Sequence, residues 1–218
     1  MWTSRSAKQA VASIVMAGLL SGLAGCQEPQ RKLVTFPPGT LPVQYEAASA
    51  PTACLVASVT MATNYVLGER RFTEPGLRAA LARQKLDEKR VGDLKTYLAE
   101  QGLEMVVVTG RPDEKPPLGL RYWLLTRGYP VICVINRQGA DPDLEKPAGP
   151  QYNHAVVVTG FSANPDQPST DIVYYLDPST ADPLQSVGWA EFEKLWARAG
   201  HAMMVVVKPP VPSSGSSR

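Results

Sequence analysis

Three cysteines and two histidines make up the residues of this 218-residue chain that could build a thiol-based site. Cys54 begins an apolar run that ends at Leu67, which predicts a buried helix with Cys54 in its first turn. The unpaired N–H groups and the positive dipole end of a helix N-terminus both favour a thiolate there. Cys54 is therefore a candidate nucleophile, and the alternative is a small buried hydrophobic residue.

A nucleophilic thiol needs a base, and the base needs a group that orients it. His154 and His201 each precede a predicted strand, so position alone does not separate them. Asp177 ends the predicted strand 172–176 and precedes Pro178, a pair that also starts turns. If the strands 155–158 and 172–176 pair antiparallel, His154 and Asp177 lie at the same sheet edge. This favours His154 as the general base and Asp177 as its orienter.

The remaining elements follow from hydrophobic periodicity and from glycine at helix ends. Helices dominate the first half of the chain and strands the second, which predicts an α+β fold. The predicted helices are 54–67, 74–84, 92–101, 118–127 and 189–199. The predicted strands are 103–109, 131–135, 155–158, 172–176 and 203–207, with a polar loop at 137–153. Cys133 lies inside the apolar strand run 131–135, so we expect a core thiol, although an exported chain could also form a Cys54–Cys133 disulfide.

Three segments carry a resemblance to a known family: CLVAS (54–58), NHAVVVTGF (153–161) and YYLDP (174–178). Over about residues 42–208 the chain resembles the bacteriocin-processing peptidase-like family of papain-type cysteine peptidases. The resemblance implies a papain-like fold, with a buried nucleophile helix in a helical N-terminal half and an antiparallel C-terminal sheet. It implies Cys54 as nucleophile, His154 as general base and Asp177 as orienter, acting on a peptide or protein without a metal or cofactor.

The chain departs from the pattern of that family at two positions. Leu55 follows the cysteine where the family usually has glycine, and Ala48 stands where the family places a glutamine that stabilises the oxyanion. Gln44 is the nearest glutamine and the candidate oxyanion donor, with Ser49 or Thr52 as substitutes. One such donor can be worth about 10²–10³ in rate. Two other functions therefore stay open: a non-catalytic lipoprotein acting in binding or assembly, and a thiol acyltransferase or transamidase.

The N-terminus reads as a targeting segment. Two basic residues precede an apolar stretch, Val11 to Gly25, that is shorter than the roughly 20 residues a membrane-spanning helix needs. The stretch ends in Leu-Ala-Gly-Cys26, which resembles the lipobox of bacterial lipoproteins. We expect a signal peptide (1–25), lipidation at Cys26, a tether (26–41), the folded domain (42–208) and a disordered tail (209–218). Gln27 after the cysteine favours the outer membrane, facing the periplasm.

The charge balance of the chain argues against a nucleic-acid partner. The chain carries 22 basic and 20 acidic residues, and two of the basic ones lie in the predicted signal peptide. The remainder is electrically balanced and has no block of like charge. We therefore expect no nucleic-acid binding.

Overall fold

The computed structural model describes residues 34–111, 115–136, 153–162 and 171–209. The predicted signal peptide, Cys26, nearly all of the predicted loop 137–153 and most of the predicted tail lie outside these ranges. Within them, no helix is long and apolar enough to cross a membrane.

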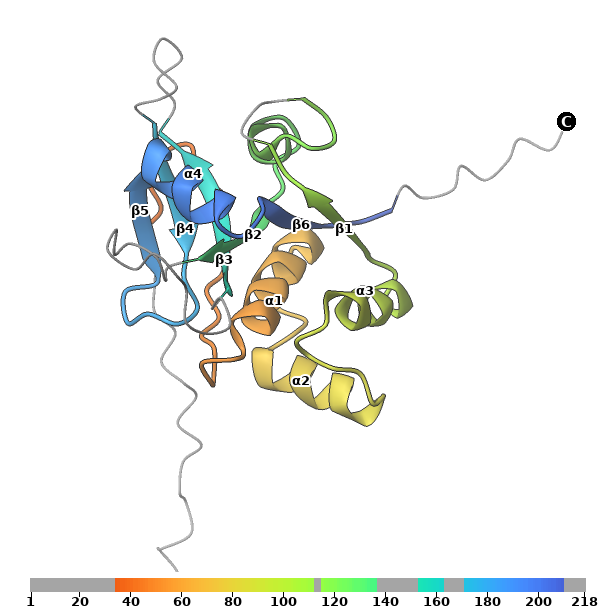
Figure 1. The fold of residues 1–218 in the computed structure, drawn as a ribbon. Coiled ribbons are helices and arrows are strands. Elements are labelled where there is room, and N and C mark those ends of the chain that lie inside the picture. The colour runs from red at the N-terminus through yellow and green to blue at the C-terminus, as the bar shows by residue number, and fades with distance from the viewer. Residues whose placement is uncertain (1–33, 112–114, 137–152, 163–170, 210–218) are drawn as a thin grey trace, which may run out of the picture. The chain divides into compact units, whose positions relative to one another are not determined.

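A six-stranded sheet organises the domain (Figure 1). Its strands are β1 (Glu104–Thr109), β2 (Val131–Asn136), β3 (Asn153–Phe161), β4 (Ile172–Leu176), β5 (Leu184–Gly188) and β6 (Ala202–Val207). They lie in the order β1-β6-β2-β3-β4-β5, and every neighbouring pair is antiparallel. Consecutive strands β2 to β5 form a meander, while β6 inserts between β1 and β2. The predicted α+β fold with a C-terminal antiparallel sheet is confirmed.

Four α-helices in the described residues pack against the sheet or against one another. They are α1 (Cys54–Leu67), α2 (Glu74–Arg83), α3 (Val91–Glu100) and α4 (Trp189–Ala197). These helices were predicted within two residues at either end. The helix predicted over 118–127 is found over residues 120–126, and its Tyr122–Thr126 portion is π-helical. Strand β5 was missed, because its residues alternate between half-buried and exposed and carry no apolar run.

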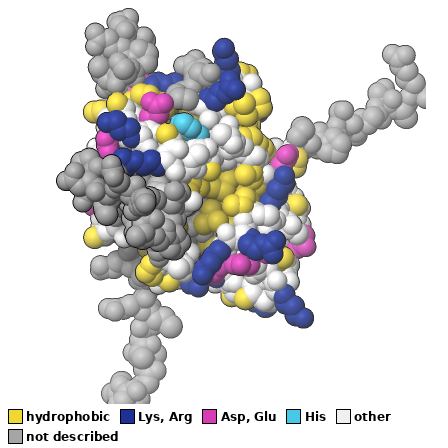
Figure 2. Space-filling view, in the orientation of Figure 1, with side chains coloured by type: hydrophobic (Ala, Val, Ile, Leu, Met, Phe, Trp, Pro, Cys, Tyr) yellow, Lys and Arg dark blue, Asp and Glu magenta, His cyan; other side chains and the backbone are white. Residues whose placement is uncertain are grey.

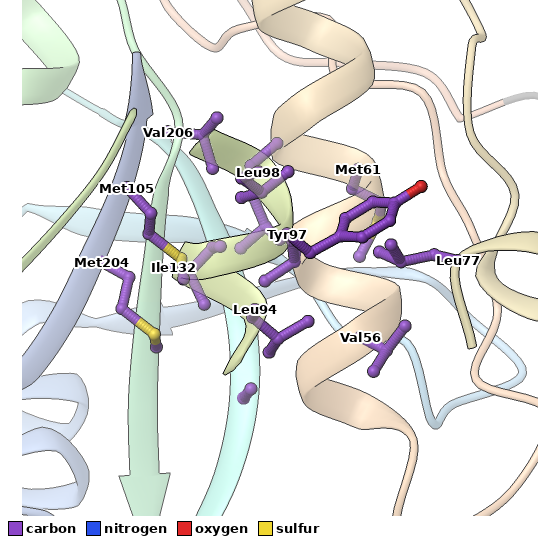
Figure 3. Close-up of a cluster of buried hydrophobic side chains, with 14 of the residues drawn as sticks. Val56, Met61, Leu77, Leu94, Tyr97, Leu98, Met105, Ile132, Met204 and Val206 are labelled. Atoms are coloured by element: carbon purple, nitrogen blue, oxygen red, sulfur yellow. The ribbon is translucent and has the colours of Figure 1, made fainter. Parts of the chain in front are cut away.

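The two faces of the sheet pack against different helices. On one face, α1 and α3 contact the sheet, while α2 packs against α1 and α3. Their buried side chains join sheet residues in one cluster, which includes Met61 of α1, Leu77 of α2 and Ile132 of β2 (Figure 3). On the other face, Phe192 and Trp196 of α4 pack into a second buried cluster. The apolar α1 is thus held against the sheet along its length, as a helix that is hydrophobic nearly all round requires.

The ends of α1 differ in how their backbone groups are satisfied. At the C-terminal end Gly68 adopts φ 73°, and its N–H donates to the Asn64 and Tyr65 carbonyls, a closure that favours glycine. At the N-terminal end the cap residue is Ala53, which has no side-chain hydrogen bond to give. No side chain therefore caps this end of α1.

The segment that leads into α1 crosses the sheet beside β3. The Leu41 N–H donates to the Thr159 carbonyl at 2.8 Å, and Thr40 forms an isolated antiparallel bridge with Gly160. The β3–β4 register shifts at this point, between Val158 and Gly160. A Cβ at Gly160 would lie 2.8 Å from the Gly39 carbonyl oxygen, so glycine permits the close approach. The last residues of the predicted tether thus contact the sheet.

Candidate active site

Cys54 lies at the first residue of α1, where the helix presents backbone N–H groups. The residue is 8% exposed and its thiol is free of any disulfide. The Cys54 N–H donates to no acceptor among the described residues. A backbone donor is therefore available beside the sulfur, where an oxyanion would form when the thiol attacks a carbonyl.

The sheet brings His154 and Asp177 together. His154 is the second residue of β3, Asp177 directly follows β4, and the antiparallel pair Val157–Leu176 places these two strand ends on the same side. The His154 Nε2–H donates to Asp177 Oδ1 at 2.8 Å. The Ser179 N–H donates to the same oxygen at 2.9 Å. Asp177 is fully buried, so its carboxylate is held in one position.

Electrostatics at the site favour charge separation between Cys54 and His154. Burial raises the pKa of the Cys54 thiol, but hydrogen bonds with His154 and with the backbone of Ala155 outweigh it, and the net pKa lies below the ordinary value. Burial lowers the pKa of His154, but hydrogen bonds to Asp177 and to Cys54, and their negative charges, raise it to about 9. Both directions stabilise a thiolate beside an imidazolium near neutral pH.

The geometry assigns a separate task to each ring nitrogen. Since Nε2 is hydrogen-bonded to Asp177, Nδ1 is the nitrogen that can exchange a proton with the Cys54 sulfur. Such an arrangement can activate a thiol, stabilise the resulting imidazolium and return a proton to a leaving group. The three residues selected from the sequence thus lie together.

His201 is placed elsewhere. Its ring packs edge-on against Trp196, with 4.8 Å between ring centroids, and its backbone carbonyl accepts the Gly110 N–H. It forms no hydrogen bond with Cys54 or Asp177 in the described part of the chain. Of the two histidines, His154 is therefore the one that contacts Asp177.

The candidate oxyanion donors have different surroundings. Gln44 is exposed and has no hydrogen bond to Cys54, His154 or Asp177 among the described residues. The Ser49 hydroxyl is already engaged, because it donates to Glu74 Oε1 at 2.9 Å and accepts from Arg78.

The residues beside Cys54 also bear on the two departures from the family pattern. The Ala48 N–H donates to the Pro178 carbonyl and ties this segment to the Asp177 turn. Leu55, the residue after Cys54, is half-buried against the core of the α1 face.

Cys133 is a core thiol, as predicted. It is free, fully buried in β2, and burial raises its pKa far above the ordinary value. No group of three or more potential metal ligands occurs in residues 34–111, 115–136, 153–162 and 171–209. On the face drawn in Figure 2, basic and acidic side chains are interspersed around a hydrophobic area.

Comparisons with known proteins bear on the fold of the chain. The model of the peptidase C39-like family matches residues 120–204, a span that includes His154 and Asp177 and begins after Cys54. A C39-like peptidase from Bacillus anthracis superposes with a TM-score of 0.55 at 19% identity, covering 78% of this chain and 98% of that one. The chain has the C39 peptidase fold.

A second solved structure with the C39 peptidase fold carries a peptide. It is a double glycine motif protease from an AMS/PCAT transporter in complex with the leader peptide. Its TM-score is 0.52 at 17% identity, covering 79% of this chain and 96% of that one. No curated protein sequence is significantly similar to this chain.

Two contacts at the site were not foreseen from the sequence. The Ser179 N–H supports Asp177, and its position two residues after an aspartate is the signal of an Asx turn. The Ser58 hydroxyl donates to the Ala155 carbonyl at 3.2 Å. Ser58 lies four residues after Cys54, on the same helix face, and a polar residue at that spacing on an apolar helix was the available signal.

Proposed function

We propose that this chain is a cysteine peptidase that hydrolyses amide bonds in a peptide or protein. Cys54 is the nucleophile, His154 the general base and acid, and Asp177 the orienting carboxylate. The observation that carries the proposal is the position of His154, bonded through Nε2 to a buried carboxylate while it also hydrogen-bonds the thiol.

The proposed reaction has two steps. The Cys54 thiolate attacks the amide carbonyl, and the oxyanion that forms accepts a hydrogen bond from the Cys54 N–H. His154 then donates its Nδ1 proton to the leaving amine, so the C–N bond breaks and a thioester remains. Water attacks the thioester while Nδ1 takes its proton, which releases the carboxylic acid and restores the thiolate–imidazolium pair.

The peptide substrate class is supported by the relatives in fold. One of them was crystallised with a leader peptide. For this chain we propose a peptide or an extended protein segment, since an extended backbone exposes its amide groups to a nucleophile.

We also propose where the enzyme works. The segment Leu-Ala-Gly-Cys26 has the residue types of a lipoprotein processing site. Lipidation of Cys26 would tether the peptidase to the envelope, most simply to the outer membrane on its periplasmic side. Two or more acyl chains give stable anchoring, at about 0.8 kcal/mol per buried CH₂ group.

Digestion of a peptide library, read by mass spectrometry, tests the peptidase activity. We expect cleavage by the wild type and by Cys133→Ala, and none by Cys54→Ala. Added amine should compete with water for the thioester only if the chain is an acyltransferase. Absence of cleavage by the wild type, together with an ordinary Cys54 reactivity, would instead favour the non-catalytic lipoprotein.

A further inference from the structure

Ser58 makes an unusual contact for a serine inside a helix. A helical serine commonly bonds a carbonyl of its own helix, three or four residues back. The Ser58 hydroxyl instead crosses to β3 and donates to the Ala155 carbonyl at 3.2 Å. Ser58 is fully buried, so this hydrogen bond is shielded from water.

The acceptor of this hydrogen bond is next to the proposed base. Ala155 directly follows His154, and its backbone also hydrogen-bonds the Cys54 thiol. Strand β4 pairs with β3 only from Val157 onward, so the backbone of Ala155 is not paired with β4. Two successive turns of α1, at Cys54 and Ser58, therefore engage the backbone of a single residue of β3.

We propose that Ser58 is a positioning residue that fixes the nucleophile helix against the base strand. The proposal rests on the proposed function, because it takes Cys54 as nucleophile and His154 as base. Its hydrogen bond to the Ala155 carbonyl keeps the Ala155 backbone and the His154 ring facing the Cys54 sulfur. Ser58 touches neither the substrate nor the reacting atoms, and it acts through the backbone of Ala155.

The same helix supplies a matched control. Thr60 and Thr63 also carry buried hydroxyls in α1, and neither hydroxyl has a hydrogen-bond partner in the described residues. Thr60→Val removes such a hydroxyl at nearly constant volume without breaking a hydrogen bond. The titratable side chain that acts on the thiol is His154 from β3, with Asp177 behind it.

The test is the rate of Cys54 alkylation by iodoacetamide as a function of pH, read at the Cys54 peptide by mass spectrometry. In Ser58→Ala we expect the midpoint of the acid limb to rise by about 0.5–1 pH unit and the rate at pH 7 to fall by up to about threefold. Thr60→Val should leave the midpoint unchanged. Ser58→Cys, which has a similar shape and a weaker donor, should lie between wild type and Ser58→Ala.

The outcomes separate this inference from the proposed function. If the wild-type midpoint lies below that of a free thiol and both Ser58 variants keep it, the positioning role is wrong and the peptidase proposal stands. If the wild-type midpoint is that of an ordinary thiol, both proposals fail.

Discussion

Replacing Asp177 with asparagine removes the negative charge behind His154 while keeping the shape of the side chain. The amide oxygen of Asp177→Asn can still accept the His154 Nε2–H and the Ser179 N–H. What changes is the stability of the imidazolium. Burial alone lowers the pKa of His154, so without the carboxylate the neutral ring gains.

The size of the effect follows from the pKa of His154. It rises from 6.5 to about 9 in the folded chain, which corresponds to about 3 kcal/mol in favour of the imidazolium. Asp177 contributes both a hydrogen bond and a charge to that rise, and Cys54 contributes the remainder. The side chain of His154 is only 12% exposed, so solvent screens these interactions modestly. We expect Asp177→Asn to lower the pKa by about one to two units.

At pH 7.5 the protonated fraction of His154 would then fall from nearly all to between about one quarter and three quarters. NMR titration of the labelled histidine rings measures this directly. The chain has two histidines, so His201→Ala assigns both signals. Alkylation of Cys54 should slow in parallel, because the thiolate loses part of its counter-ion. A His154 pKa that stays near 9 in Asp177→Asn would refute the role given to the carboxylate.

Three further predictions concern the pH profile, the β3 bulge and the anchor. Peptide cleavage should follow a bell-shaped pH profile. Its acid limb lies below the ordinary thiol pKa, because Cys54 must be a thiolate, and its alkaline limb lies near pH 9, because His154 then loses the proton needed by the leaving amine. Initial rates that keep rising above pH 10 would contradict this prediction. Gly160→Ala should cost about 1–3 kcal/mol in urea unfolding, since its Cβ meets backbone at 2.8 Å, whereas Gly92→Ala, with open space around it, should not destabilise; equal midpoints would count against the close approach. Cys26→Ser should move the protein from the membrane pellet to the supernatant, and unchanged pelleting would disprove the anchor.

Local patterns predicted the elements of the site because each signal lies within a few residues. The apolar run after Cys54 and Gly68 at its end located α1 at its observed bounds. Antiparallel pairing of two apolar strands was enough to bring His154 and Asp177 to one sheet edge. The sequence could not exclude His201 in the same way, because its distinguishing contact is a ring packed on Trp196, which only the tertiary structure supplies.

Long-range contacts account for what the sequence did not reveal. The Ser58–Ala155 hydrogen bond joins residues 97 apart, and the polar position within an apolar helix does not identify its partner. Strand β5 gains its structure from pairing with β4, not from its own apolar residues. Hydrophobic periodicity also could not predict that Tyr122–Thr126 is π-helical, because it indicates only which residues share one side of a helix.

The central claim is that His154 activates Cys54, and the alkylation rate of Cys54 near pH 7 tests it most directly. At that pH only a few per cent of an ordinary thiol is ionised, whereas a paired thiol is largely thiolate. Since a thiolate of lower pKa is also less nucleophilic, the gain over a free thiol should be about tenfold. We predict that His154→Ala loses this gain and that His201→Ala keeps it. Equal alkylation rates in the wild type, His154→Ala and His201→Ala would contradict the claim.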